Sequence, residues 1–363
     1  MQRVPVSKLV RGPAASPERI LFYSLWFKGH NNPIVAELLL RMARLDACLL
    51  PLPGPRLARG VALRAYQRTR RLHEPAVLRR AGERYRWLFT GDPEQAALFP
   101  GGVAVLLDDP YWTPRELGLL NRPNVKAIFV TRERAGQRLV ELGVETPTFV
   151  IPQGVSLRSI DHAKRDELIR EKHARGAFVA GYHASFILTK DDRGGDSPPY
   201  NVDHLLEQWD AVHERAPRAE LWLLGGASDR VRARCAGRSD IVVLGRKPRS
   251  EYLAYVAAFD VGLYARAKDT GVQSAKVIDY LGAGVPVVGY DYDVVRDDIG
   301  PTGAGVLVDT PAELVAALVA LAGDAARRDE LAAAAARAGA GHDWDILAER
   351  YAAVLDERLP ATP

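Results

Sequence analysis

The chain has 363 residues, of which 47% are hydrophobic and 26% are charged, and its formal net charge is +4. This balance is typical of a folded globular protein and excludes a chain that is mainly disordered or membrane-spanning. At about 150 residues per domain the length predicts two domains, each large enough to bury its own core.

The first part of the chain alternates predicted strands with predicted helices. Helices are expected over 32–44 and over 56–84, the second one interrupted at Pro75 because proline lacks the amide hydrogen that a helix interior needs. Short apolar, β-branched runs predict strands over 20–25, 47–52, 85–89, 103–107, 127–130 and 148–151.

The segment 56–86 carries ten arginines and two glutamates, a local charge of +8. Arg64, Arg68 and Arg71 fall on one face of the expected helix. Such a face would rest on an anionic lipid surface or contact an anionic acceptor. Alternatively, it is an ordinary solvated face. Nucleic acid is not expected as a partner, because stacking aromatics are sparse and no nucleic-acid-binding motif is present.

A polar segment over 156–175 precedes a second alternation, which begins at Phe178. Its strands are predicted over 178–182, 219–224, 241–244, 261–264, 285–288 and 305–308, and an alanine-rich surface helix over 331–340. Strands that alternate with helices in this way predict an α/β protein of two Rossmann-like parallel-sheet domains facing across a cleft. The expected domains are 1–155 and 156–340, and 341–363 forms a helix that returns to the first domain.

Two observations favour a cytoplasmic protein. We expect no signal peptide, because the apolar stretch Leu21–Phe27 is short and no cleavage site follows it. Cys48 and Cys235 fall in different predicted domains, so a disulfide between them is not expected, and two unpaired thiols suit a reducing compartment.

The segment 259–290 contains the clearest chemical signal of the chain. It predicts a strand, a polar loop, a helix that opens near Lys276 and closes at Gly282 or Gly284, and a second strand. The start of this helix would face the carboxyl end of a strand, where α/β sheets bind ligands and where free amide groups attract phosphate. A nucleotide diphosphate is the natural ligand of such a site.

This segment resembles the donor-site segment of GT-B glycosyltransferases of the family 4 / group 1 type, which reads K-x-x-[ED]-Y-L-x-x-G-x-P-V-V. Three further stretches match in order: I-P-Q-G-V at 151–155, the strand and glycine loop at 221–226, and the strand and loop at 242–246. Trp344 and the helix-like 346–359 resemble the closing helix of that fold. In two places the chain departs from the common pattern of two glutamates eight residues apart, because Gly271 stands at the first position and Asp279 at the second.

The resemblance implies a donor site for a UDP-, GDP- or dTDP-linked sugar. Asp279 is expected to bind the ribose hydroxyls, although a carboxylate in the first turns of a helix is also explained by the helix dipole alone. Lys276 and the backbone amides of Gln273 and Ser274 would meet the diphosphate. Lys190 and Arg193 are the residues that remain to supply positive charge to the leaving group.

Two further regions complete the expected site. Arg246 would lie on the side of the base, and Gly29 with His30 would form the loop that approaches donor and acceptor. Arg246 and His30 are equally explained as surface residues.

The catalytic hypothesis rests on Asp108 and Asp109, which follow a predicted strand in V-A-V-L-L-D-D-P-Y-W. A carboxylate there could act as the general base toward an acceptor hydroxyl, and the anomeric centre would then be inverted. If Asp108 only orients the sugar, the leaving phosphate takes the proton and configuration is retained. A helix N-cap before Pro110 or Pro114 would explain the same residues structurally.

We expect no metal and no cofactor beyond the donor. Asp291-Tyr292-Asp293 matches the short D-x-D motif of metal-dependent transferases, but it follows the fifth strand of the second sheet, where that motif does not belong. No phosphate-binding Walker loop, dinucleotide fingerprint, esterase elbow or zinc motif is present, so kinases, dehydrogenases, esterases and zinc enzymes are excluded.

The function expected from these observations is transfer of a sugar from a nucleotide diphosphate to a hydroxyl of a glycan, a lipid-linked or a secondary-metabolite acceptor. A nucleotide-sugar epimerase of the same fold and a non-catalytic nucleotide-sugar-binding protein remain open as alternatives, since fold resemblance alone does not determine function.

Overall fold

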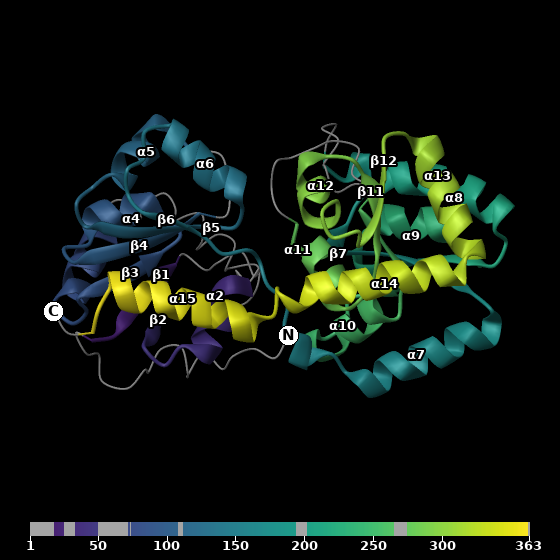
Figure 1. The fold of residues 1–363 in the computed structure, drawn as a ribbon, viewed down its shortest axis with the longest axis horizontal. Helices are drawn as coiled ribbons and strands as arrows, with labels where there is room; N and C mark the ends of the chain where they lie inside the picture. The colour runs from purple at the N-terminus through teal and green to yellow at the C-terminus, as the bar shows by residue number, and fades with distance from the viewer. Residues whose placement is uncertain are drawn as a thin grey trace. The chain divides into compact units, whose positions relative to one another are not determined.

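The structure is a computed structural model, and it describes residues 18–24, 33–49, 72, 74–107, 112–193, 202–264 and 274–361. The chain divides into two compact units. The first unit comprises residues 3–153 together with 344–363, and the second comprises residues 154–343. Each unit contains a six-stranded sheet in which every strand pairing is parallel (Figure 1).

In the first unit the strand order is β2-β1-β3-β4-β5-β6. The strands are β1 (Ile20–Ser24), β2 (Leu45–Leu49), β3 (Trp87–Thr90), β4 (Gly102–Leu107), β5 (Val125–Val130) and β6 (Thr148–Val150). The helices are α2 (Pro33–Arg41), a helix over 74–82, α4 (Pro93–Leu98), α5 (Pro114–Leu120), α6 (Glu133–Glu141) and α15 (Trp344–Arg358).

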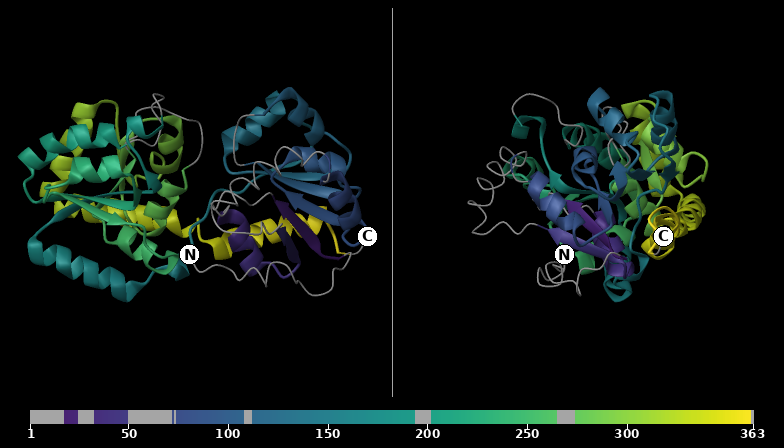
Figure 2. Two further views of the ribbon diagram at one scale, coloured as in Figure 1. Left: turned by 180° about the vertical axis from the view of Figure 1, so that it is seen from behind. Right: turned by 90° about the vertical axis from the view of Figure 1, so that its left-hand side faces the viewer.

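Alternating side chains of this sheet enter two separate cores. The core covered by α2 and α15 contains Phe22, Phe89 and Phe129. The core on the other face, beneath α4 to α6, contains the neighbouring strand residues Leu21 and Leu88. This alternation follows from the two-residue period of a strand. The last helix of the chain, α15, therefore lies beside α2 on the sheet of the first unit (Figures 1 and 2).

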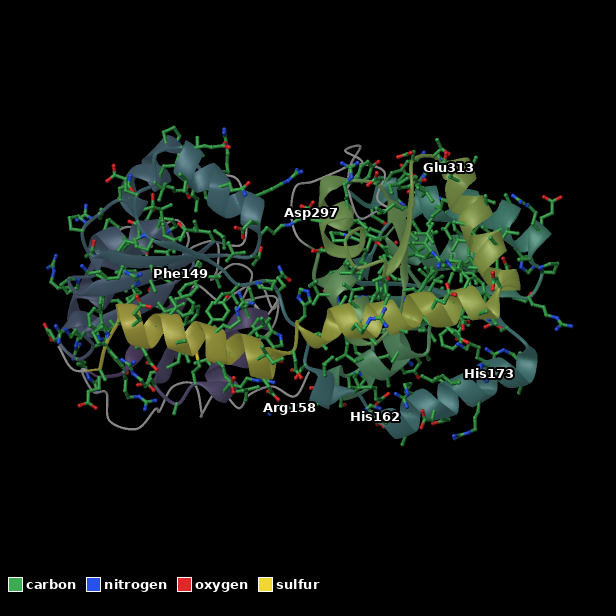
Figure 3. All side chains as sticks on the ribbon, viewed as in Figure 1. Phe149, Arg158, His162, His173, Asp297 and Glu313 are labelled. Atoms are coloured by element: carbon green, nitrogen blue, oxygen red, sulfur yellow. The ribbon has the colours of Figure 1, made fainter. Side chains whose placement is uncertain are left out.

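Aromatic side chains attach α15 to that sheet. The Tyr351 ring lies 4.9 Å from the Phe129 ring and 6.3 Å from the Phe89 ring, measured between centroids. Phe149 of β6, labelled in Figure 3, packs against Phe129 at 6.0 Å and lies under the Arg358 guanidinium at 5.4 Å. Residues 344–358 thus belong to the core of a sheet formed by residues 20–150.

In the second unit the strand order is β12-β11-β10-β7-β8-β9. The strands are β7 (Phe178–Ile187), β8 (Ala219–Ala227), β9 (Ile241–Gly245), β10 (Val261–Tyr264), β11 (Val287–Tyr290) and β12 (Gly305–Val308). The helices are η1 (Leu157–Ser159), α7 (His162–Arg175), η2 (Lys190–Arg193), α8 (Asp203–Arg215), α9 (Asp229–Cys235), α10 (Arg249–Ala257), α11 (Ala275–Gly282), α12 (Asp293–Ile299), α13 (Pro311–Gly323) and α14 (Ala325–Ala340).

If β7 is numbered as the first strand of the second unit, the order from the β9 edge is 3-2-1-4-5-6. This is the strand order of a dinucleotide-binding Rossmann sheet. One face is covered by α8, α9 and α13, and the other mainly by α7, α10, α11 and α14. The prediction of two parallel α/β sheets is confirmed.

Several expected boundaries were wrong. The predicted strand 285–288 is β11 at 287–290, because residues 285 and 286 complete the turn after α11. The expected surface helix 331–340 begins at Ala325, and it is partly buried because Gly339 packs against the α11 backbone, where a Cβ would lie 2.1 Å from the Leu281 carbonyl oxygen. Pro75 does not end the helical segment, since residues 72 and 74–82 are all helical.

Candidate functional site

The strand order of the second unit reverses between β7 and β10, and open α/β sheets bind ligands at the carboxyl edge beside such a reversal. These two strands pair in register at only two positions, Val261 with Ala180 and Gly262 with Gly181. Beyond them the Tyr280 hydroxyl bridges the strands, 3.0 Å from the Gly181 carbonyl oxygen and 3.2 Å from that of Leu263. A buried side chain thus occupies the place where further ladder hydrogen bonds would form.

Two glycines make room for this arrangement. A Cβ at Gly262 would lie 2.5 Å from the Tyr280 ring, and one at Gly181 would lie 1.9 Å from the Phe259 ring. Burial raises the pKa of the Tyr280 hydroxyl well above its ordinary value, so the phenol stays protonated and remains a hydrogen-bond donor.

Asp279 belongs to a group of three polar side chains at this edge. The Tyr252 hydroxyl of α10 donates to Oδ2 of Asp279 on α11, and it lies 2.9 Å from Nδ1 of His183 on β7. Nε2 of His183 is 4.0 Å from the same carboxylate oxygen. The Asp279 side chain is 20% exposed, so part of the carboxylate remains open to a ligand.

His183 is held neutral in this group. Burial lowers the pKa of its imidazole well below the ordinary value, and the nearby charge of Lys276 lowers it further, against an opposing backbone hydrogen bond with Lys276. The ring also packs edge-on against the Tyr252 and Tyr280 rings, at centroid distances of 5.3 Å and 4.8 Å. The imidazole is therefore a fixed, uncharged partner of Tyr252.

The start of α11 concentrates positive electrostatic potential. Ser274 precedes the helix and is buried, and among the described residues its hydroxyl makes no capping hydrogen bond. Lys276 lies in the first turn, is 8% exposed, and places Nζ 3.7 Å from the centroid of the Tyr182 ring. A buried ammonium is unfavourable beside the positive end of a helix. An anion bound at the start of α11 would stabilise both the Lys276 ammonium and the positive end of the helix.

Arg246, directly after β9, meets the carboxyl end of β7. Its Nη2 donates to the Ser185 carbonyl oxygen at 3.2 Å, and its guanidinium lies 4.2 Å from the centroid of the exposed Phe186 ring. Gly226 at the end of β8 leaves space for this side chain, since a Cβ there would lie 2.6 Å from the Arg246 Nε. The end of β7 thus contacts Arg246 and, through His183, the group that holds Asp279.

Lys190 is connected differently. Its backbone amide donates to the Asp203 carboxylate at 2.6 Å, and its side chain is exposed in η2. The structure therefore anchors the backbone of Lys190 on the first residue of α8.

The remaining predicted site residues lie outside the described residues. Gly29 and His30 follow β1, Asp108 and Asp109 follow β4, and Gln273 precedes Ser274. Most of the basic segment 56–86 and Gly271 also lie outside them. Their assignments stay predictions.

Asp291 of the D-x-D motif forms an ion pair with Arg296, Nε to Oδ1 at 2.7 Å. That hydrogen bond lowers the pKa of the Asp291 carboxyl. Across the part of the chain that the structure describes, no group of three or more histidine, cysteine, aspartate or glutamate side chains is arranged to hold a metal ion.

Residues 194–324 match the family model described as glycosyl transferases group 1. The chain therefore carries a glycosyltransferase domain. The matched segment runs from before α8 to the end of α13 and includes Tyr252, Lys276 and Asp279. No curated protein sequence matches the chain significantly.

Solved structures similar to this chain share its architecture. Anabaena HepE, crystallised in complex with UDP and glucose, is 15% identical with a TM-score of 0.70, over 93% of this chain and 99% of that one. Sucrose-phosphate synthase from Thermosynechococcus elongatus is 15% identical with a TM-score of 0.62, over 95% and 100%. The UDP-forming trehalose-phosphate synthase from Burkholderia vietnamiensis is 12% identical with a TM-score of 0.63, over 93% and 100%. These likenesses confirm the GT-B fold.

Sequence reasoning missed two members of the polar group around Asp279. Tyr252 lies 27 positions from Asp279 on a helix without a recognisable motif. His183 stands in G-Y-H-A directly after the predicted strand 178–182, and that position was the available signal. Among the described residues, no helix is both long enough and apolar enough to cross a membrane.

Proposed function

We propose that this protein transfers a sugar from a nucleotide diphosphate to an acceptor hydroxyl without a required metal ion. The observation that carries the proposal is the combination, at one edge of the second sheet, of the α11 N-terminus, buried Lys276 and partly exposed Asp279. A nucleotide diphosphate supplies an anion for the first two and a ribose diol for the third.

In this proposal the second unit holds the donor. The backbone amides at Gln273 and Ser274 and the ammonium of Lys276 bind the diphosphate, and Asp279 accepts hydrogen bonds from the ribose hydroxyls. Arg246 contributes to the side where the base is held. We take UDP as the first nucleotide to test, because HepE was crystallised with UDP and with UDP-glucose.

Transfer breaks the bond between the anomeric carbon and the diphosphate oxygen and forms a bond from that carbon to the acceptor oxygen. The leaving diphosphate gains negative charge as its bond breaks. Lys276 and Lys190 stabilise that charge, which is the task a metal ion performs in other transferases. Activity should therefore persist in EDTA.

We further propose that the first unit supplies the acceptor-side groups. Asp108 or Asp109 removes the acceptor proton, and Gly29 and His30 form the neighbouring loop. Proton removal by Asp108 predicts inversion, whereas transfer of the proton to the leaving phosphate predicts retention. The acceptor classes are a glycan, a lipid-linked molecule or a secondary metabolite, with 56–86 as a contact to an anionic membrane surface on the cytoplasmic side.

The donor assignment is tested by thermal shift with UDP-, GDP- and dTDP-sugars, since a ligand at 100 times its Kd stabilises by about 2.7 kcal/mol. Calorimetry then compares wild type, Asp279→Ala and the exposed control Asp329→Ala. Asp279→Ala should weaken nucleotide binding by about 1–3 kcal/mol because a charged hydrogen-bonded pair is lost. Equal affinity in all three proteins would contradict the ribose role.

Turnover is tested by incubating the bound donor with and without acceptor mixtures and following nucleotide release and sugar products. Release that depends on an acceptor supports transfer. A new sugar nucleotide formed without acceptor would instead show an epimerase, and binding without any chemistry would show a binding protein. Asp108→Asn should abolish turnover and leave nucleotide affinity unchanged.

A further inference from the structure

Tyr252 is placed to control the orientation of Asp279. The residue lies on α10, which packs against α11 through Leu253 and Ile278 in a small apolar cluster with Val155. Its ring is partly buried, and its hydroxyl donates to Oδ2 of Asp279. The two helices therefore fix the donor and the acceptor of this hydrogen bond relative to each other.

His183 constrains the same hydroxyl from the other side. A tyrosine hydroxyl has one hydrogen and can still accept a second hydrogen bond. Because its hydrogen goes to Asp279, the hydroxyl meets Nδ1 of His183 through its oxygen, at 2.9 Å. Tyr252 is thus held by a strand residue while it holds a helix residue.

The chemical consequence concerns the open part of the carboxylate. With Oδ2 engaged by Tyr252, the carboxylate cannot rotate freely, and the exposed part of the Asp279 side chain meets a ligand in one orientation. The two adjacent hydroxyls of a ribose can both donate to a carboxylate held in one orientation, whereas a 2′-deoxyribose offers only one hydroxyl there. Preorganised acceptors bind more tightly because no side-chain freedom is lost on binding.

We propose that Tyr252 is a positioning residue that makes the donor site selective for ribonucleotides over 2′-deoxyribonucleotides by orienting Asp279, with His183 as its support. The proposal rests on the proposed function, since it assumes that Asp279 binds the ribose. The Asp279 side chain reaches the Tyr252 hydroxyl from the middle of α11.

The test is calorimetry of UDP and of 2′-deoxy-UDP with wild type and Tyr252→Phe, which removes only the hydroxyl. We expect the variant to bind UDP about tenfold more weakly and to bind 2′-deoxy-UDP within about twofold of wild type. In an Asp279→Asn background the same substitution should have no further effect, because its target is already removed. A variant that keeps the wild-type ratio of the two affinities overturns the proposal.

Two controls separate positioning from structural damage. Tyr255→Phe alters a buried tyrosine on the same helix that contacts Lys247 instead, and it should leave both affinities unchanged. If Tyr252→Phe does not fold, His183→Phe should shift the ratio in the same direction by removing the other partner of the hydroxyl. An unchanged ratio in His183→Phe would then overturn the proposal.

Failure of the proposed function gives a different result. If wild type binds neither UDP nor GDP, or if Asp279→Asn binds UDP as well as wild type does, the ribose assignment itself is wrong. A third result would overturn only the role of Tyr252. In that case wild type binds UDP more tightly than 2′-deoxy-UDP, Asp279→Asn loses this preference, and Tyr252→Phe keeps it.

Discussion

The two sheets reverse their strand order in similar ways but differ at the point of reversal. In the first unit β1 and β3 pair from Ile20 with Trp87 to Tyr23 with Thr90, the last residue of β3. In the second unit β7 and β10 pair at two positions, and the Tyr280 hydroxyl bridges the strands beyond them. The two units share one architecture, but only in the second are the two strands at the reversal separated, because the buried Tyr280 side chain is inserted between them.

The polar groups at the two edges differ as well. At the end of β3, the Thr90 hydroxyl donates to Gln95, whose amide donates to Glu74 at 2.9 Å, and all three side chains are buried. At the edge of the second sheet, Asp279 receives a hydrogen bond from Tyr252 and remains partly exposed. The first arrangement is fully buried, whereas the second keeps a carboxylate partly exposed.

The largest expected effect concerns the assignment of α15 to the first unit. Trp344 is 1% exposed in the core of that unit, so Trp344→Ala should destabilise it by about 3–5 kcal/mol because a large cavity is left. Hydrogen exchange should show loss of protection in β1 to β6. Trp209→Ala, in the core of the second unit, is the matched control and should lower protection in β7 to β12 instead. Equal losses in both units from either substitution would contradict the division.

A smaller effect is expected from closing the space at the reversal of the second sheet. Gly262→Ala places a methyl group against the Tyr280 ring and should destabilise the protein by about 1–3 kcal/mol through overpacking. Urea unfolding measures the change. Gly323→Ala, at the end of α13 with no neighbouring atom within 4 Å, is the control in the same unit. If the two substitutions have equal effects, the Tyr280 ring does not constrain Gly262.

The buried imidazole of His183 predicts a pH dependence for the second unit. Its pKa in the folded protein lies well below the ordinary value of 6.5, so below that pH the unfolded chain binds a proton that the folded chain does not. The contribution of neutral His183 to the free energy of unfolding is complete above pH 6.5, and it is lost as the pH falls toward the pKa of the folded protein. The slope reaches about 1.4 kcal/mol per pH unit for one proton.

Urea titrations of wild type and His183→Gln between pH 5 and 7.5 test this expectation. The variant should show a flatter dependence, and an equal slope would mean that His183 titrates normally. Carboxyls with lowered pKa, such as Asp240, whose main cause is the Arg238 hydrogen bond, lose their contributions only at lower pH. These carboxyls therefore do not mask the effect of His183 between pH 5 and 7.5.

The smallest effect is expected in the first unit, at a glycine that has no packing role. Gly118 lies inside α5 with no neighbouring atom within 4 Å of a Cβ built there. Gly118→Ala should therefore stabilise the protein by about 0.5–1 kcal/mol, because alanine loses less backbone entropy in a helix. A lower unfolding midpoint in urea would show that α5 is constrained in a way that its surroundings do not reveal.

Much of this fold was predictable because its signals are local. β10 and β12 have the predicted bounds, and α11 begins within one residue of its predicted start. Buried parallel strands appear as short apolar runs, and glycines mark where helices end, as Gly284 does with its φ of 71°. Lys276 and Asp279 were proposed as donor-site residues because they stand in a segment that resembles a GT-B donor motif, and their roles stay predictions.

The rest depended on residues that are distant in the chain. The amino-acid sequence by itself determined the alternation of strands and helices and the chemical character of the segment around α11, since both follow from periodicity and residue type. Only the tertiary structure decided that Tyr252 and His183 meet Asp279 and that Tyr280 bridges β7 and β10. These contacts join separate strands and helices, and their geometry is set by how whole elements pack, which no local pattern encodes.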